Sequence, residues 1–353
     1  MAKQTKVKVQ KSKEQFQLEK QLLLSPIKRK VKSLSEKQRN IKLPQYIQFE
    51  LDETCKALLL YMKNQPTTNS EGFADNLNYT CDKNMQTDNA AFEGWAIVLK
   101  AWLPEKIEKV TIRWDIPSDN KKTEHYRRFC YRVLKFKESY TWFDVHSSNR
   151  NEIDTFSKCF ISTSLINNYG ENVPQKKFKH NGKIGENAVE YDMVHEKDFS
   201  KQLCERFNLS ELNHQLLVGI KENKENGNFY FAGGKAAIDL WGTKENELSI
   251  IELKYENEMV GIITELFFYV SIMKDIITGR IEAPTGKLPY ERRLYSSIHN
   301  YKTINAILLA DRFHPLIENN QVFEVLNQCS CQEIQIKYQK ASYHYNPATL
   351  SLI

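Results

Sequence analysis

Two apolar runs in the C-terminal half of the chain have the length and spacing of the two strands of a β-hairpin. Residues 236–241 (AAIDLW) and 248–255 (LSIIELKY) are rich in strand-forming residues, and the polar GTKENE between them predicts the turn. Side chains alternate between the two faces of a strand, so Glu252 and Lys254 should point to the same side. Folding of the hairpin brings Asp239 near Glu252. The pattern therefore predicts two carboxylates and one ammonium on one side of a sheet edge.

The segment 260–278 is apolar on nearly every side, which predicts a buried helix that ends before Gly279. Its three charged residues and its length argue against a membrane span. Glu265 and Tyr269 are four positions apart and share one face of this helix. Glu265 either joins the charged residues at the sheet edge or is a buried carboxyl group hydrogen-bonded to Tyr269 or to the backbone.

The rest of the hydrophobic pattern predicts an α/β protein. Helices are expected at 51–64, 90–102, 196–207 and 320–327, and strands at 109–115, 128–145, 215–220, 228–231, 304–310 and 333–338. Residues 171–185 are rich in Lys, Asn and Gly and predict a linker. We therefore expect a basic N-terminal arm (1–44), an α+β region of unassigned role (45–180) and a C-terminal domain (181–353).

The acidic residues of the hairpin are unusual because they lie inside apolar strands. Charged side chains rarely occupy such positions without a partner or a metal ion. Carboxylate oxygens suit Mg²⁺, which would polarise a phosphoryl group and lower the pKa of a bound water. Lys254 would orient or help to deprotonate that water and offset charge in the transition state. The alternative is an exposed Glu-x-Lys triplet, or an ion pair between neighbouring strands.

Together these residues resemble the PD-(D/E)XK nuclease superfamily, which has the restriction-endonuclease-like fold. Asp239 corresponds to the metal-binding Asp of that family, Glu252 to its second acid and Lys254 to its catalytic Lys, while Ile238 stands where the Pro of the name would be. The resemblance implies a C-terminal core with a mixed central sheet flanked by helices. A helix, a three-stranded meander, a second helix and a further strand should follow one another along the chain.

The same resemblance implies the composition of the site. Glu265-x-x-x-Tyr269 looks like the Gln-x-x-x-Tyr element of the RecB-like branch, with Glu in place of Gln. Mg²⁺, which Mn²⁺ would replace, is expected to bind Asp239, Glu252 and the backbone carbonyl of Leu253. Glu196 is a candidate accessory acid at the start of a helix; the alternative is a solvated Glu favoured by the helix dipole.

The implied activity is hydrolysis of phosphodiester bonds in DNA that leaves a 5′-phosphate, in bacterial restriction or antiphage defence. A homodimer and a partner protein from a defence system are further expectations of this resemblance. Two alternatives remain open, namely a catalytically silent nucleic-acid-binding or scaffold protein with the same fold, and an enzyme that cleaves RNA.

Charge is distributed unevenly along the chain. Residues 1–44 hold thirteen Lys and Arg and three Glu, so their net charge is +10, whereas the whole chain carries +6. A cluster in this arm could neutralise nucleic-acid phosphates, and it consists of Lys28, Arg29, Lys30 and Lys32. The alternatives are a solubilising tail and a helix that docks elsewhere. The basic and aromatic residues of 128–145 likewise fit either a nucleic-acid-facing sheet or a solvated sheet face.

The remaining composition fits a cytoplasmic protein. No run of eighteen apolar residues is present, so we expect no membrane span, and the N-terminus lacks the apolar core of a secretory signal. The seven cysteines are scattered without zinc-finger spacing, which predicts reduced thiols.

Overall fold

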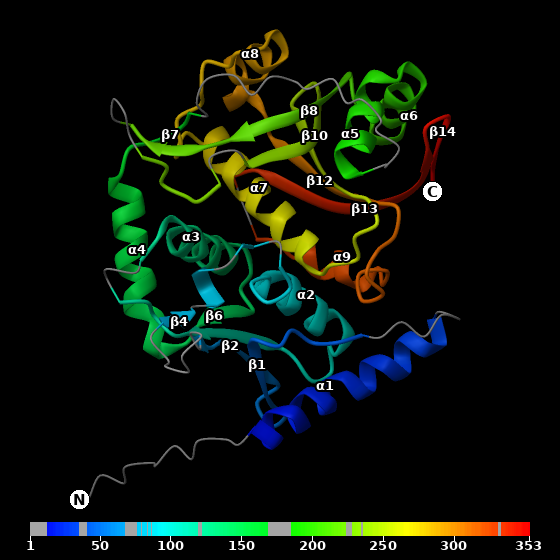
Figure 1. Cartoon of the computed structure of the whole chain (residues 1–353). Coiled ribbons are helices and arrows are strands. Elements are labelled where there is room, and N and C mark those ends of the chain that lie inside the picture. The colour runs from blue at the N-terminus through cyan, green and yellow to red at the C-terminus, as the bar shows by residue number, and fades with distance from the viewer. Residues whose placement is uncertain are drawn as a thin grey trace, which may run out of the picture.

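The computed structural model describes most of the chain, and the helices and strands are labelled as in Figure 1. The described residues are 13–34, 41–67, 76–78, 80–82, 84–85, 87–118, 122–168, 185–223, 228–233, 236–330 and 333–353. Within them the protein is a mixed α/β structure, with a four-stranded sheet in the N-terminal region and a six-stranded sheet in the C-terminal region.

The C-terminal sheet combines an antiparallel meander with a parallel part. Its strands lie in the order β14-β13-β12-β11-β10-β8. Neighbours are antiparallel from β8 through β10 to β11 and parallel from β11 through β12 to β13. The bounds are β8 Glu211–Val218, β10 Ala236–Lys244, β11 Glu247–Lys254, β12 Thr303–Ala310, β13 Gln335–Asn346 and β14 Thr349–Leu352. The predicted hairpin is confirmed, although its turn is only two residues long because both strands extend into the polar segment.

Helices cover both faces of this sheet (Figure 1). Helix α7 (Gly261–Ile277) packs with the face that carries Ile250, while α5 (Glu186–His195) and α6 (Lys197–Phe207) cover the face that carries Ile251 and Leu253. Burial of each such aliphatic side chain contributes about 1.5–3 kcal/mol to stability. Because side chains alternate along β11, Glu252 and Lys254 point to the same side as Ile250, toward α7.

The N-terminal region contains a second, smaller sheet in the order β1-β2-β5-β6. Its strands are β1 Ile47–Asp52, β2 Ala57–Met62, β5 Lys109–Trp114 and β6 Phe143–Val145, and the last three run parallel. The helices of this region are α2 (Phe92–Trp102), α3 (Glu124–Ser139) and α4 (Arg150–Ser162). Helix α2 contacts α7 directly, so the two regions share one hydrophobic core.

Two sequence-based predictions for the N-terminal region are wrong. The helix expected at 51–64 is the β1–β2 hairpin, in which Leu58, Leu60 and Met62 are buried at every second position. The strands expected over 128–145 are mostly α3. Every side chain from Arg128 to Phe136 is buried in α3, so packing on several sides of the helix outweighs the strand propensity of its aromatic residues. The basic residues of this segment therefore form no sheet surface, and Arg132 is fully buried.

The other predicted elements agree with the structure where it describes them. Residues 90–102, 196–207 and 320–327 are helical as α2, α6 and α9 (Gln321–Leu326), and 109–115, 215–220, 304–310 and 333–338 contain strands. Residues 228–231 form only an isolated bridge, and nearly all of the predicted linker at 171–185 lies outside the described residues. Unpredicted short elements are β3 Gln65–Thr67, β4 Asn76–Asn78, β7 Leu165–Asn167, β9 Ile220–Glu222 and α8 Pro289–Ser296.

Most of the described part of the basic arm is the helix α1 (Lys13–Leu34), which docks on the N-terminal region. Leu23, Ile27 and Val31 are buried in the shared core. Lys30 donates to the Trp102 carbonyl at 2.9 Å and lies 3.6 Å from the Glu105 carboxylate. Lys28 and Arg29 are exposed, and the side chain of Lys32 lies outside the described residues. In the described part of the chain, no helix is both long and apolar enough to span a membrane.

Candidate active site

The hairpin strands β10 and β11 separate at the end opposite their turn, and this opening creates the site. Their main-chain pairing reaches only as far as Leu240 and Ile251. One residue further from the turn, a side chain replaces the main-chain acceptor. The Oδ2 of Asp239 accepts the backbone N–H of Leu253 at 2.9 Å. Asp239 on β10 therefore lies opposite Glu252 on β11, as the sequence predicts.

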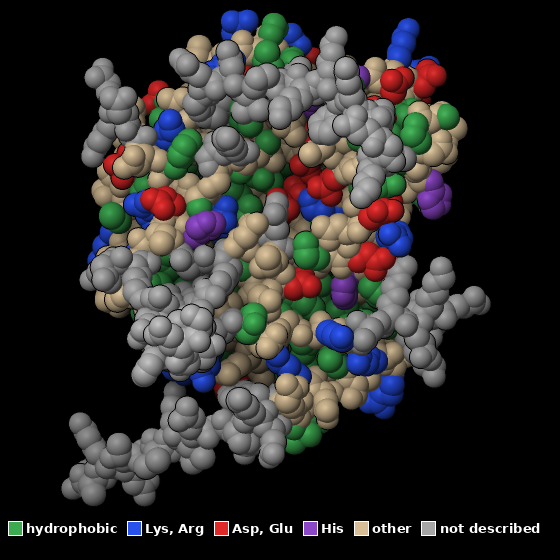
Figure 2. Space-filling model, in the orientation of Figure 1, with side chains coloured by type: hydrophobic (Ala, Val, Ile, Leu, Met, Phe, Trp, Pro, Cys, Tyr) green, Lys and Arg blue, Asp and Glu red, His purple; other side chains and the backbone are tan. Residues whose placement is uncertain are grey.

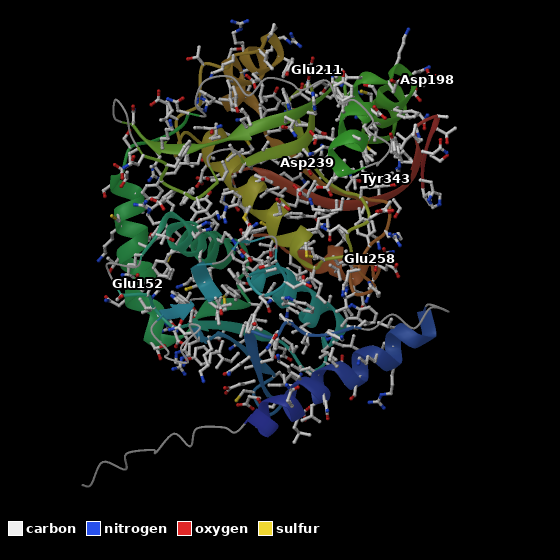
Figure 3. The ribbon with its side chains drawn as sticks, viewed as in Figure 1. Glu152, Asp198, Glu211, Asp239, Glu258 and Tyr343 are labelled. Carbon is white, nitrogen blue, oxygen red and sulfur yellow. The ribbon has the colours of Figure 1, made fainter. Side chains whose placement is uncertain are left out.

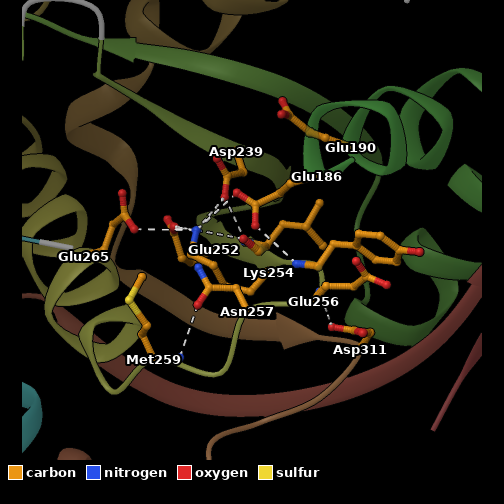
Figure 4. Close-up of polar contacts among 12 residues, drawn as sticks. Glu186, Glu190, Asp239, Glu252, Lys254, Glu256, Asn257, Met259, Glu265 and Asp311 are labelled. Atoms are coloured by element: carbon orange, nitrogen blue, oxygen red, sulfur yellow. Dashed lines mark hydrogen bonds and ion pairs between the residues drawn. The ribbon is translucent and has the colours of Figure 1, made fainter. Parts of the chain in front are cut away.

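Four carboxylates surround the ammonium group of Lys254 (Figure 4). The Lys254 Nζ lies 2.6 Å from Glu252 Oε1, 3.5 Å from Glu265 Oε2, 3.5 Å from Glu186 Oε1 and 3.9 Å from Asp239 Oδ2. These acids come from α5, β10, β11 and α7, so the cluster joins both helical layers to the sheet.

The end of β11 is fixed by further hydrogen bonds. The Leu253 carbonyl accepts from Lys254 Nζ at 2.9 Å, which shows that this carbonyl faces the charged cluster. Tyr343 of β13 donates its hydroxyl to the Lys254 carbonyl at 3.0 Å (Figure 3). Glu186 also accepts the backbone N–H of Tyr255 at 3.2 Å. The strand end is thus tied to both β13 and α5.

The cluster is recessed but not sealed. Glu252 is 1% exposed and Glu265 3%, whereas the side chain of Glu186 is 35% exposed. A cavity of about 80 Å³ opens beside them and is lined by Glu186, Lys254, Asn257, Met259, Ile262 and Glu265. On the face seen in Figure 2, acidic and basic side chains gather in a hollow in the upper half of the molecule. Of the four carboxylates, those of Glu186 and Glu265 line the cavity.

Burial and mutual repulsion favour the protonated forms of Asp239 and Glu252. Burial raises the pKa of Asp239 to about 8, against the lowering effect of Lys254. Burial, followed by the charges of Asp239 and Glu265, raises the pKa of Glu252 well above its usual value. The pKa of Lys254 is also raised well above its usual value, because the surrounding carboxylates outweigh burial, which lowers it. Lys254 is therefore an ammonium group in this environment.

Several oxygen atoms of the cluster are of the kind that a divalent cation binds. Among the described residues, no three acidic, histidine or cysteine side chains already form a set of metal ligands, and the Lys254 ammonium stands where the carboxylates converge. The second oxygen of Glu252, Oε2, is buried without a hydrogen-bond partner within the described part of the chain. A proton or a metal ion would satisfy this oxygen. Hard oxygen ligands for Mg²⁺ are available from Asp239, Glu252 and the Leu253 carbonyl.

Tyr269 lies one helical turn beyond Glu265 and is 3% exposed. Burial, followed by the charges of Glu265 and Glu252, raises its pKa well above the usual value, so the phenol stays neutral. Arg128 of α3 is one charged residue near the site that sequence reasoning missed, because it was placed in a strand. Burial, followed by the charge of Arg132, lowers the pKa of Arg128 to about 10, while the charge of Glu265 acts in the opposite direction.

The helix acid beside Lys254 is Glu186 and not Glu196. Glu196 is exposed at the junction of α5 and α6, whereas Glu186 begins α5 and reaches both Lys254 and Tyr255. The apolar stripe of α6 is visible in the sequence, whereas α5 has almost no amphipathic pattern. For this reason the sequence predicts no helix at 186–195.

Comparison with protein-family models, with curated proteins and with solved structures gives no match. The interpretation of the site therefore depends on its geometry and its chemistry.

Proposed function

We propose that this chain is a Mg²⁺-dependent nuclease with a restriction-endonuclease-like core that hydrolyses phosphodiester bonds in DNA, with Mn²⁺ able to replace Mg²⁺. The observation that carries the proposal is the meeting of Asp239, Glu252 and Glu265 at the ammonium of Lys254. Buried acids with raised pKa values in a cleft are typical of functional sites.

The order of elements around the site supports the resemblance to the PD-(D/E)XK superfamily. Helices α5 and α6 precede the antiparallel strands β8, β10 and β11, and α7 then leads to β12, which pairs parallel to β11. This is the helix, meander, helix and strand that the family pattern requires. Glu252 and Lys254 lie at the end of the third meander strand, beside the crossover helix.

The residues of the site would divide the chemistry among them. Mg²⁺, when bound by Asp239, Glu252 and the Leu253 carbonyl, would polarise the phosphodiester and lower the pKa of the attacking water. As an ammonium group, Lys254 would orient that water and stabilise charge that develops on the phosphoryl oxygens. Glu265 would hold Lys254 in place.

A role in bacterial restriction or antiphage defence, with cleavage by a homodimer or together with a partner protein, is proposed by analogy with the fold alone. The exposed Lys28 and Arg29 of α1 would add salt-dependent contacts to DNA phosphates.

The test is a cleavage assay with the purified full chain and Mg²⁺ or Mn²⁺ on plasmid, single-stranded DNA and RNA. We expect cleavage of DNA by the wild type, none in EDTA, and loss of cleavage in Glu252→Gln. Cleavage of RNA alone would replace DNA as the substrate. DNA binding without cleavage under all these conditions would identify a scaffold protein and reject the nuclease proposal.

A matched pair of variants tests which helix acid belongs to the site. Glu186→Gln is expected to weaken Mn²⁺ binding about tenfold, because removal of a supporting group beside metal ligands commonly costs 10–100-fold in affinity. Glu196→Gln, which makes the same change at the exposed junction of α5 and α6, should bind Mn²⁺ like the wild type. Calorimetric titration of both variants decides the assignment, and the reverse result would return the role to Glu196.

A further inference from the structure

The N-terminus of α7 is capped by a residue from the N-terminal region. Val260 occupies the cap position, but its apolar side chain cannot accept a hydrogen bond. Asp88 supplies the missing acceptor, since its Oδ1 accepts the backbone N–H of Val260 at 3.0 Å and that of Gly261 at 3.3 Å. The backbone carbonyl of Asp88 is itself held by Trp95 Nε1 at 2.9 Å. A carboxylate at this end also interacts favourably with the helix dipole.

A second contact holds the same turn of α7. Helix α2 crosses α7 at Gly94, where a Cβ atom would lie 2.7 Å from the Val260 carbonyl oxygen, so only glycine fits without a shift. The Gly94 N–H donates to Thr264 Oγ1 at 3.3 Å, and Thr264 Oγ1 donates to Glu93 Oε2 at 3.2 Å. Arg132 of α3 fixes Glu93 with a hydrogen bond of 2.7 Å from its Nε.

These contacts end immediately before the active-site acid. Thr264 precedes Glu265, whose Oε2 lies 3.5 Å from Lys254 Nζ on the sheet side of the helix. The hydrogen bonds inside a helix make one turn move as a unit, so a shift at Val260 or Thr264 also displaces Glu265. A displacement of about 1 Å in a catalytic constellation can cost on the order of 100-fold in rate.

We propose that Asp88 and Gly94 are positioning residues, through which the N-terminal region sets the place of Glu265 in the candidate active site. This inference deepens the proposed nuclease function and rests on it. It implies that the N-terminal region supports the site through its contacts with α7 and is not a separable substrate-binding module.

The other end of α7 offers a matched control. Tyr131 of α3 donates its hydroxyl to Asp275 Oδ2 at 2.8 Å, and Lys135 Nζ lies 2.9 Å from Asp275 Oδ1. These contacts also join α3 to α7, but they lie about three turns away from Glu265. Tyr131→Phe removes one hydrogen bond between the two regions without touching the first turn of α7.

The experiment measures Mn²⁺ affinity by calorimetry and the melting temperature Tm for the full-length wild type, Asp88→Ala, Asp88→Asn, Gly94→Ala and Tyr131→Phe. Asp88→Ala and Gly94→Ala are expected to weaken Mn²⁺ binding about tenfold, because a displaced Glu265 no longer holds Lys254 beside the proposed ligand Glu252, and outer groups of this kind commonly contribute 10–100-fold to affinity. Asp88→Asn keeps an oxygen acceptor and should restore wild-type affinity. Tyr131→Phe should lower Tm but leave the affinity unchanged.

The outcomes separate the two proposals. If the wild type binds Mn²⁺ and both Asp88→Ala and Gly94→Ala bind it equally well, the positioning role is rejected while the nuclease site stands. Equal weakening in Asp88→Asn would reject capping as the cause. Equal weakening in Tyr131→Phe would show a general effect of the interface and would also reject the proposal. If the wild type binds no Mn²⁺, the proposed metal site itself fails.

Discussion

Replacement of Lys254 by methionine is expected to lower Mg²⁺-dependent DNA cleavage by about 10²–10³-fold, the usual cost of removing one preorganised donor from a reaction centre. Lys254 contacts four carboxylates and is fully charged in their field, so it is the principal positive group of the site. Methionine preserves most of the volume of the side chain and removes the charge. Initial rates on plasmid DNA, measured at saturating Mg²⁺, give the magnitude.

Lys201→Met is the matched control, because Lys201 is exposed on α6 and pairs only loosely with Glu205 at 3.8 Å. This variant should cut DNA at the wild-type rate. Circular dichroism of Lys254→Met establishes that the protein remains folded. A folded Lys254→Met protein that cuts as fast as the wild type would show that the reaction centre lies elsewhere.

The second large effect concerns the stability of the metal-free protein as a function of pH. Burial raises the pKa of Asp239 to about 8 in the folded state, whereas the pKa of a free Asp is about 4. Between these values the folded state binds more protons than the unfolded chain, so the free energy of unfolding falls as pH rises from about 4 to 8. One pKa unit corresponds to about 1.4 kcal/mol, and the total loss should reach a few kcal/mol.

Asp239→Asn tests this linkage, because asparagine keeps an oxygen for the Leu253 N–H but does not ionise. In EDTA, the Tm of the wild type should fall by several degrees between pH 5 and pH 8, while the Tm of Asp239→Asn should fall less. Mg²⁺ should restore the Tm of the wild type at pH 8 and have little effect on the variant. Parallel Tm curves for the two proteins in EDTA would contradict a raised pKa at Asp239.

The buried acids show why such a site is stabilised by its ligand. Glu252 is almost inaccessible and lies beside Asp239, and the raised pKa values of both groups favour their protonated forms in the metal-free protein. If the proposed divalent cation binds, it would displace these protons, and its affinity should therefore increase with pH.

The local part of the site could be predicted from the sequence. Asp239 and Glu252 are thirteen residues apart on two strands joined by a tight turn, and the alternation of apolar positions fixes which side chains share a face. The nearly uniformly apolar helix that carries Glu265 was equally visible. Period and spacing encode such contacts because they lie within a single hairpin or a single helical turn.

The long-range part was decided only by the tertiary structure. Glu186 reaches Lys254 from 68 residues away and Asp88 reaches Val260 from 172 residues away, and no periodicity in the chain links these pairs. The α3 segment was taken for strands because aromatic residues favour strands in isolation, whereas packing against α7 selects the helix. The sequence by itself determined which residues could form a metal-binding hairpin. The tertiary structure decided which helix acid joins it and which distant residue holds α7, because those choices depend on how sheets and helices pack and not on local spacing.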